Sequence, residues 1–176
     1  MVLDTSAFVA GFDPFTASEQ QFTTLSVEQE VKRNPLTLLR FDMAVENGKI
    51  KIRAPTQTSL EQVKDCATSV GDAFYLSQTD VEVLALALEL KSEGGAPQIL
   101  TDDYSIQNVA TKLGVNYVSM GTLGIKRVLT WVRYCPACHK KYPPNGKATV
   151  CLVCGTQLKR KPLRKGQERK PAQKSV

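Results

Sequence analysis

The stretch "SQTDVEVLALALELKSEGGAPQILTDDYSIQN" (residues 77–108) decides the fold class. Ser77 and Asp80 stand at the spacing of a capping box, and the apolar residues after them cover nearly the whole circumference of a helix. Such a helix is predicted to be central and buried. Two glycines at 94–95 end it, and the apolar run 96–101 predicts a strand that leads into a second helix. Helix, strand and helix in this order are typical of an α/β protein.

The segments before this stretch extend the same pattern. "MVLD" (1–4) and "FTTL" (22–25) predict strands, each followed by a helical segment, and Pro35 is expected to end the second helix. Residues 44–55 are expected to form a β-hairpin insert, because Asn47-Gly48 stands between two β-prone flanks. We therefore predict an α/β fold with a mostly parallel sheet flanked by helices. Functional sites in such folds gather beyond the carboxyl ends of the strands.

Charge is distributed unevenly along the 176 residues. Residues 1–125 hold nine lysine and arginine residues against 16 acidic ones, a net charge of −7, whereas residues 126–158 carry +6 and residues 159–176 carry +7. A basic C-terminal third favours an anionic partner such as nucleic acid; the alternative is a solvated acidic surface with a tail that serves solubility alone. Few apolar residues occur in 159–176, so we expect a flexible basic tail there.

The ends and apolar runs of the sequence bear on localisation. The chain starts "MVLDTSAF", with an acid at position 4 in place of the basic start of a signal peptide, and no apolar run has the length needed to span a bilayer. We expect a soluble cytoplasmic protein with no membrane partner.

Four of the five cysteines form two C-x-x-C pairs, which predict a metal site. Without a secretion signal, paired thiolates favour metal over disulfides, and two pairs at this separation close a tetrahedral zinc site; redox or iron use is the alternative. The module is too short to bury a core, so bound zinc would supply most of its folding energy. Residues 126–158 are therefore predicted to be a linker and a zinc ribbon. Its ligands are Cys135, Cys138, Cys151 and Cys154. Basic residues suited to phosphate contacts surround them and continue into the tail: Arg133, Lys140, Lys141, Lys147, Lys159, Arg160 and Lys161.

Any catalysis by residues 1–125 must rest on carboxylates. The single histidine lies in the cysteine module, and no Walker loop or G-x-G-x-x-G is present. Asp4 and the pair Asp102-Asp103 follow apolar strands, and Asp80 opens the buried helix. Adjacent residues of a strand point to opposite sides, so Asp102 and Asp103 cannot do the same job. Clustered carboxylates repel unless a divalent cation screens them, which favours Mg²⁺ or Mn²⁺; the alternative is that Asp80 only caps its helix.

Four segments in order, followed by the zinc ribbon, resemble the successive motifs of PIN-domain nucleases. The last of them has the form T-x-D-aromatic-x-x-Q-N, which resembles the Nob family of endonucleases in its compact archaeal form. The resemblance covers nearly the whole chain except the tail. It rests on "VLDTSAFV" (2–9), "SVEQEV" (26–31), "LSQTDVEVLALALEL" (76–90) and "ILTDDYSIQNVA" (99–110).

The resemblance implies which acids act. The second motif has two candidates, of which Glu30 matches the family's V-x-x-E pattern and Glu28 is the alternative. In the last motif it selects Asp103 and leaves Asp102 facing solvent or capping the next helix. The implied catalytic acids are Asp4, Glu30, Asp80 and Asp103, with Asp4, Asp80 and Asp103 as ligands of Mg²⁺ or Mn²⁺. The hydroxyl residues beside them are Thr5, Ser6, Thr79 and Thr101.

The resemblance also implies a function. Nob-family endonucleases cut pre-rRNA to form the mature 3′ end of the small-subunit rRNA, so residues 1–125 are expected to be a metal-dependent nuclease domain and the zinc structural. The implied partners are pre-rRNA, the precursor of the small ribosomal subunit and a KH-domain assembly factor. Two alternatives remain at this point: an RNA-binding assembly scaffold without catalysis, and a PIN ribonuclease of the toxin type.

Overall fold

A central parallel sheet organises the N-terminal part of the molecule. The computed structural model describes residues 1–125, 128–143, 146 and 148–163. Its larger sheet has the order β3-β2-β1-β4-β5, and every neighbouring pair is parallel. The strands are β1 (Val2–Leu3), β2 (Gln21–Thr23), β3 (Ile50–Ile52), β4 (Gln98–Leu100) and β5 (Asn116–Val118). This sheet confirms the predicted α/β class.

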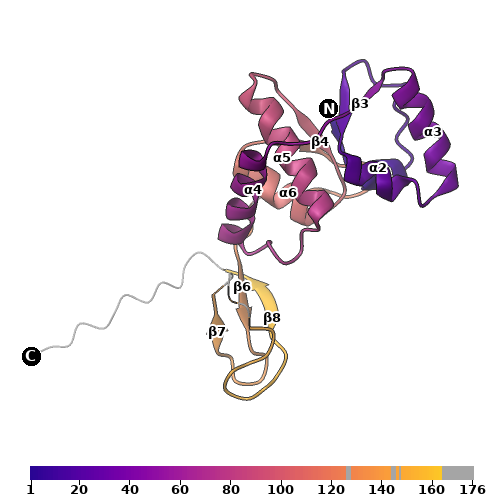
Figure 1. Ribbon diagram of the computed structural model, residues 1–176. Coiled ribbons are helices and arrows are strands. Elements are labelled where there is room, and N and C mark those ends of the chain that lie inside the picture. The colour runs from indigo at the N-terminus through magenta and orange to yellow at the C-terminus, as the bar shows by residue number, and fades with distance from the viewer. Residues whose placement is uncertain (126–127, 144–145, 147, 164–176) are drawn as a thin grey trace, which may run out of the picture.

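Helices flank the sheet, and the most apolar of them is central (Figure 1). The capping box of Ser77 and Asp80 opens α5 as predicted, and every residue from Val83 to Ala87 is buried. Glycines in the left-handed conformation end α4 and α6, at Gly71 and Gly114. The helices are α1 (Thr5–Val9), α2 (Leu25–Val31), α3 (Pro35–Glu46), α4 (Gln57–Val70), α5 (Gln78–Ser92) and α6 (Tyr104–Leu113).

The order of the strands places a switch point at β1. The chain first builds outward through β2 and β3, then returns to the other side of β1 with β4 and β5. Asp4 follows β1 directly, and Thr101 follows β4 at the same edge of the sheet. Parallel strands whose order reverses in this way leave a crevice beyond their carboxyl ends, where functional groups converge.

The predicted β-hairpin at residues 44–55 is wrong. Pro35 starts α3 in place of ending α2, and α3 continues to Glu46. Gly48 takes a positive φ of 70° at the end of that helix, and β3 then pairs in parallel with β2. A glycine in the left-handed conformation serves a helix end as well as a hairpin turn, so Asn47-Gly48 does not separate the two. Phe41 and Ala44 are buried, and the Phe41 ring packs against that of Phe8 in α1 with ring centres 5.3 Å apart, which favours the helix.

A second, antiparallel sheet follows the part that contains the parallel sheet. It has the order β7-β6-β8, with β6 (Trp131–Tyr134) between β7 (Lys141–Tyr142) and β8 (Lys159–Pro162). Figure 1 shows β6 entering this separate small unit from the body of helices. The prediction of a flexible tail from residue 159 is therefore wrong at its start, because all four residues of β8 pair with β6. Residues 164–176 lie outside the described residues, and so does the rest of that prediction.

The helices also bear on membrane association. In the described part of the chain, none is both long and apolar enough to cross a bilayer.

Candidate active site and metal centre

Asp4 lies at the centre of the acidic site, directly after β1. Its side chain does not cap α1, and only 4% of the residue is exposed. One carboxylate oxygen, Oδ2, accepts hydrogen bonds from Ser6 Oγ at 2.6 Å and from Thr101 Oγ1 at 2.8 Å. Burial raises the pKa of Asp4 above its ordinary value, and these hydrogen bonds offset only part of that rise. Because burial makes the negative charge of Asp4 costly, a cation bound to this carboxylate would stabilise its ionised form.

Glu30 reaches the same region from α2. Its two carboxylate oxygens accept from Thr5 Oγ1 and from Thr79 Oγ1, each at 2.6 Å. Thr5 opens α1 and Thr79 lies in the first turn of α5, so Glu30 ties three helices together. Glu28 instead pairs with Lys32 on its own helix at 2.8 Å. The structure therefore brings Glu30, and not Glu28, to the hydroxyl groups around Asp4.

The carboxylate of Asp80 helps to cap α5 through a hydrogen bond, and its ionised form is disfavoured by its surroundings. Its Oδ2 accepts from the backbone nitrogen of Ser77 at 2.7 Å, which completes the capping box of α5. Burial raises its pKa to about 6, and the negative charges of Asp4 and Asp103 add to the rise. Asp4 and Asp103 are thus near enough for their charges to oppose the ionisation of Asp80.

Asp103 and Asp102 are separated by their hydrogen bonds. Asp103 is the N-cap of α6, and its Oδ1 accepts from the backbone nitrogens of Ser105 at 2.6 Å and Ile106 at 3.3 Å. Of the two expectations for Asp102, that it caps this helix is wrong, because Asp103 is the N-cap. The Asp102 carboxylate instead accepts from three successive backbone nitrogens, at residues 120–122, over 3.0 to 3.1 Å.

The loop after β5 gives Asp102 a structural task. Partial desolvation raises the pKa of Asp102, but the amides of Gly121, Thr122 and Met120 outweigh it and hold the pKa below its ordinary value. An Asp102 carboxylate that is already bound by three amides is poorly suited to a metal. Asp103 is the acid whose charge acts on Asp80.

The acidic site fits a divalent cation on the chemistry of its donors. Among the residues that the structure describes, none of the four acids (Asp4, Glu30, Asp80 and Asp103) forms an ion pair with lysine or arginine. Hydroxyl donors hold Asp4 and Glu30 in place without neutralising them. The carboxylate oxygens are less closely gathered than the thiols of the ribbon. Mg²⁺ and Mn²⁺ prefer carboxylate oxygens as ligands, and a bound ion would offset the repulsion that keeps these oxygens apart.

The four cysteines of the ribbon form a ready metal site. Their sulfur atoms all lie within 4.8 Å of one another, and the pairs Cys135–Cys154 and Cys138–Cys151 are each 3.4 Å apart. This spacing suits tetrahedral zinc, whose bonds to sulfur are about 2.3 Å long. Sequence reasoning missed Tyr142, whose hydroxyl lies 3.1 Å from Cys151 Sγ. That contact lowers the pKa of Cys151 to about 6, which favours the thiolate that zinc requires.

Comparison with known proteins agrees with both parts of the molecule. The family described as "PIN domain of ribonuclease" matches residues 1–90. Endoribonuclease Nob1 of Methanothermobacter thermautotrophicus is 35% identical to this chain over 91% of this chain and 91% of its own length. Endoribonuclease Nob1 of Pyrococcus abyssi is 37% identical over 93% of this chain and 94% of its own. The chain belongs to the Nob1 endoribonuclease family. Ribonuclease VapC1 of Thermoplasma acidophilum is also similar, at 35% identity over 90% of this chain and 76% of its own length.

The basic residues of this Nob1-family chain divide into two groups. Lys140, Lys141, Lys159 and Lys161 are exposed on the ribbon. The sequence also predicts RNA contacts for Arg133 and Arg160, but both form interactions within the protein. Arg133 donates to the carbonyl oxygens of Gly146 and Ala148, and Arg160 forms an ion pair with Asp72 at 3.0 Å. Lys147 lies outside the described residues.

Proposed function

We propose that the chain is a divalent-metal-dependent endoribonuclease that cuts pre-rRNA to form the mature 3′ end of the small-subunit rRNA. One observation carries the catalytic part of this proposal. Four acids from different elements, namely Asp4, Glu30, Asp80 and Asp103, converge beyond the central strands with no cationic side chain among the described residues to neutralise them. Membership of the Nob1 family supports the choice of RNA as substrate.

The acids have separate tasks in this proposal. Asp4, Asp80 and Asp103 hold one or two Mg²⁺ or Mn²⁺ ions, and a bound divalent cation supplies acidified water and charge neutralisation for the attacked phosphodiester. Glu30 is fixed by Thr5 and Thr79, and its remaining lone pairs can orient the attacking water. The water oxygen bonds to phosphorus as the bond from phosphorus to the 3′ oxygen breaks. The products carry a 5′-phosphate and a 3′-hydroxyl.

The ribbon supplies the binding that the acidic part cannot. Residues 1–125 carry a net charge of −7, which repels an RNA strand, so affinity falls to the exposed lysines of the ribbon. Structural zinc on the four cysteines holds these lysines in place. The precursor of the small ribosomal subunit is the natural substrate, met in the cytoplasm, and a KH-domain assembly factor is a further partner.

The test is cleavage of an RNA that spans the 3′ end of the small-subunit rRNA, both free and within a precursor particle. Asp103→Asn should abolish cleavage and leave RNA binding largely intact. Asp102→Asn is the matched control, because Asn keeps an acceptor oxygen for the loop amides, and it should retain most activity. Undiminished cleavage by Asp103→Asn in both substrates would overturn the proposal.

A second candidate is a PIN ribonuclease of the toxin type, acting on tRNA or mRNA. This candidate is supported by the similarity to a ribonuclease VapC1 over most of this chain. The same acids serve both functions, so substrate competition decides between them. Preference for tRNA or mRNA over the rRNA 3′ end, at equal concentration and with Asp103→Asn inactive on all three, would select the toxin type.

A further inference from the structure

An ion pair between a buried aspartate and a partly exposed arginine joins the nuclease domain to the zinc ribbon. Asp72 lies between α4 and α5 and is only 1% exposed. Its Oδ1 accepts from Arg160 of β8 at 3.0 Å, and its Oδ2 accepts from Asn108 Nδ2 of α6 at 2.5 Å. Removing Arg160 would leave the buried Asp72 carboxylate without its cation, which is costly for a charge shielded from water. Arg160 is therefore held to the nuclease domain and is not a free cation of the ribbon surface.

Aromatic rings surround the same arginine. The Arg160 guanidinium carbon lies 3.5 Å from the ring centre of Tyr75 and 4.3 Å from that of Trp131. Tyr75 belongs to the nuclease domain and Trp131 to β6, so the guanidinium is stacked by both parts of the molecule. Arg133 repeats the arrangement, 4.2 Å from the ring centre of Phe74. Such cation–aromatic contacts add attraction without requiring either ring to be buried.

Asn108 fixes the connection between the two parts. Its Oδ1 accepts from the backbone nitrogen of Leu129 at 2.7 Å, and its Nδ2 donates to the carbonyl oxygen of the same residue at 2.8 Å. The amide therefore pairs with the peptide group of Leu129 as a neighbouring strand would, two residues before β6 begins. Asn108 is 2% exposed, so these bonds are shielded from water.

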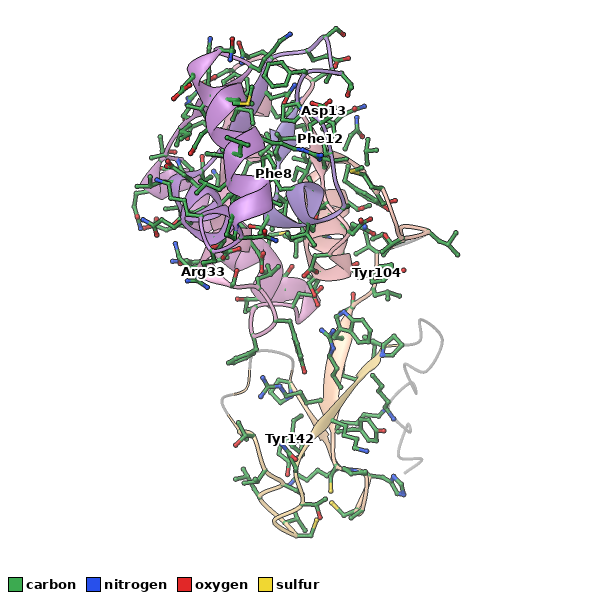
Figure 2. All side chains as sticks on the ribbon, turned by 90° about the vertical axis from the view of Figure 1, so that its right-hand side faces the viewer. Phe8, Phe12, Asp13, Arg33, Tyr104 and Tyr142 are labelled. Atoms are coloured by element: carbon green, nitrogen blue, oxygen red, sulfur yellow. The ribbon has the colours of Figure 1, made fainter. Side chains whose placement is uncertain are left out.

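The elements that hold the ribbon are also those that present acids. Asp72 lies in the segment that leads into α5, whose first turn carries Asp80. Asn108 lies on α6, whose N-cap is Asp103. In Figure 2 Tyr104, the residue after Asp103, lies at the edge of the nuclease domain that faces the ribbon. The ribbon is thus held by α6, which presents Asp103, and by the segment that leads into α5, which presents Asp80.

We propose that Asp72, Asn108 and Arg160 form an interdomain clasp that holds the zinc ribbon in a fixed orientation to the acidic site. The three are positioning residues: an RNA strand bound by the ribbon lysines is delivered to Asp80 and Asp103 because the clasp sets the path between them. The proposal rests on the proposed function for its kinetic consequence only. Its structural consequence is that the two parts of the free protein tumble as one body.

In the alternative assignment, Arg160 contacts RNA. The substitution Asp72→Asn distinguishes the two assignments, because they predict changes in RNA binding of opposite sign. If Arg160 binds phosphate, replacing the neighbouring carboxylate frees the arginine and removes one negative charge that repels RNA, so RNA affinity rises. If Arg160 belongs to the clasp, the same substitution loosens the ribbon and raises KM for an RNA long enough to reach both parts. Asp65→Asn, on the exposed surface of α4, is the matched control for loss of one negative charge.

The decisive measurement is ¹⁵N relaxation on the full zinc-loaded chain, with and without the clasp. The unsubstituted protein should give one correlation time for both parts. Asp72→Asn, and Tyr75→Leu, which keeps every charge and hydrogen bond of the clasp, should each give the ribbon a shorter correlation time than the nuclease domain. Tyr75 is half-exposed, so its substitution leaves the fold intact even if Asp72→Asn does not. Independent tumbling in the unsubstituted protein, or unchanged tumbling in both variants, would overturn the clasp.

Kinetics supply the second readout. For a long RNA, Asp72→Asn should raise KM at least about fivefold, the lower end of the coupling found between linked sites. For a short oligonucleotide that reaches the acids but not the ribbon, kcat and KM should stay unchanged. An equal loss of kcat on both substrates, or a higher affinity for the long one, would refute the clasp. If no RNA is cut at all, the proposed function fails, and the relaxation data still decide whether the clasp exists.

Discussion

Asp80→Asn should stabilise the nuclease domain at neutral pH in the absence of Mg²⁺ and Mn²⁺. The raised pKa of Asp80, about 6 against an ordinary 3.8, means that the folded protein keeps this proton where the unfolded chain has lost it. Stability from this group is therefore present at low pH and is lost as pH rises through about 6. Asparagine carries no charge, so the variant does not show this loss.

The size of the effect follows from the same pKa. With pKa values of about 6 and 3.8, about 1.4 kcal/mol of the loss falls between pH 5 and pH 7.5. Asp80 is only partly buried, and solvent screening reduces this to about 1 kcal/mol. The change in the N-terminal cap is the same at both pH values, so it cancels when the two are compared.

The assay is urea unfolding followed by the far-ultraviolet helical signal. All helices among the described residues lie in residues 1–125, so this signal reports the nuclease domain even if the ribbon loses zinc at pH 5. From pH 5 to pH 7.5 the difference in unfolding free energy should shift by about 1 kcal/mol in favour of Asp80→Asn. Added Mn²⁺ at pH 7.5 should then stabilise the unsubstituted protein more than the variant. An equal difference at both pH values would refute the account of Asp80 as a strained carboxylate.

Three further predictions concern the acids and the ribbon. Glu30→Gln should lower kcat for RNA cleavage far more than Glu28→Gln, because only Glu30 is held among the hydroxyls of the site; equal losses would contradict this. Cys151→Ser should abolish stoichiometric zinc, measured by elemental analysis, since it removes one of four thiolates; retained zinc at one ion per chain would show another ligand set. Deleting residues 126–176 should weaken RNA binding and flatten its dependence on salt, because the phosphate contacts are lost; an unchanged salt slope would place those contacts on the nuclease domain.

The parts of the fold that the sequence predicts well are those whose signals are local. The capping box of α5, its all-round apolar surface and the paired cysteines each lie within a few residues, and each is found as expected. Asn47-Gly48 is also a local signal, but it fits two structures equally. The choice of helix over hairpin depends on burial of Phe41 against partners such as Phe8, which lie far away in the sequence and which no short window contains.

Features that depend on distant partners could not be predicted. The segment "KRKP" of β8 has the composition of a tail and becomes a strand because β6 pairs with it and aromatic rings receive its cations. Asp72 reads as an ordinary surface acid until Arg160, 88 residues away, is placed beside it. The same limit applies to Asp102 and Asp103: strand alternation separates them, but the amides that engage Asp102 lie after β5.

The separation of charge between the two parts links RNA binding to cation binding. Under the proposed function, an RNA strand bound by the ribbon lysines would approach an acidic domain of net charge −7, in which Asp4 and Asp80 already have raised pKa values. Each divalent cation bound there offsets two of the negative charges that repel the strand, so cation binding should raise RNA affinity. Linkage then requires that RNA raise the affinity for the cation by the same factor. Under the proposed function, the site should therefore bind its cation more tightly with RNA present than without it, because the cation is the charge that offsets acids which no lysine or arginine of the described chain neutralises.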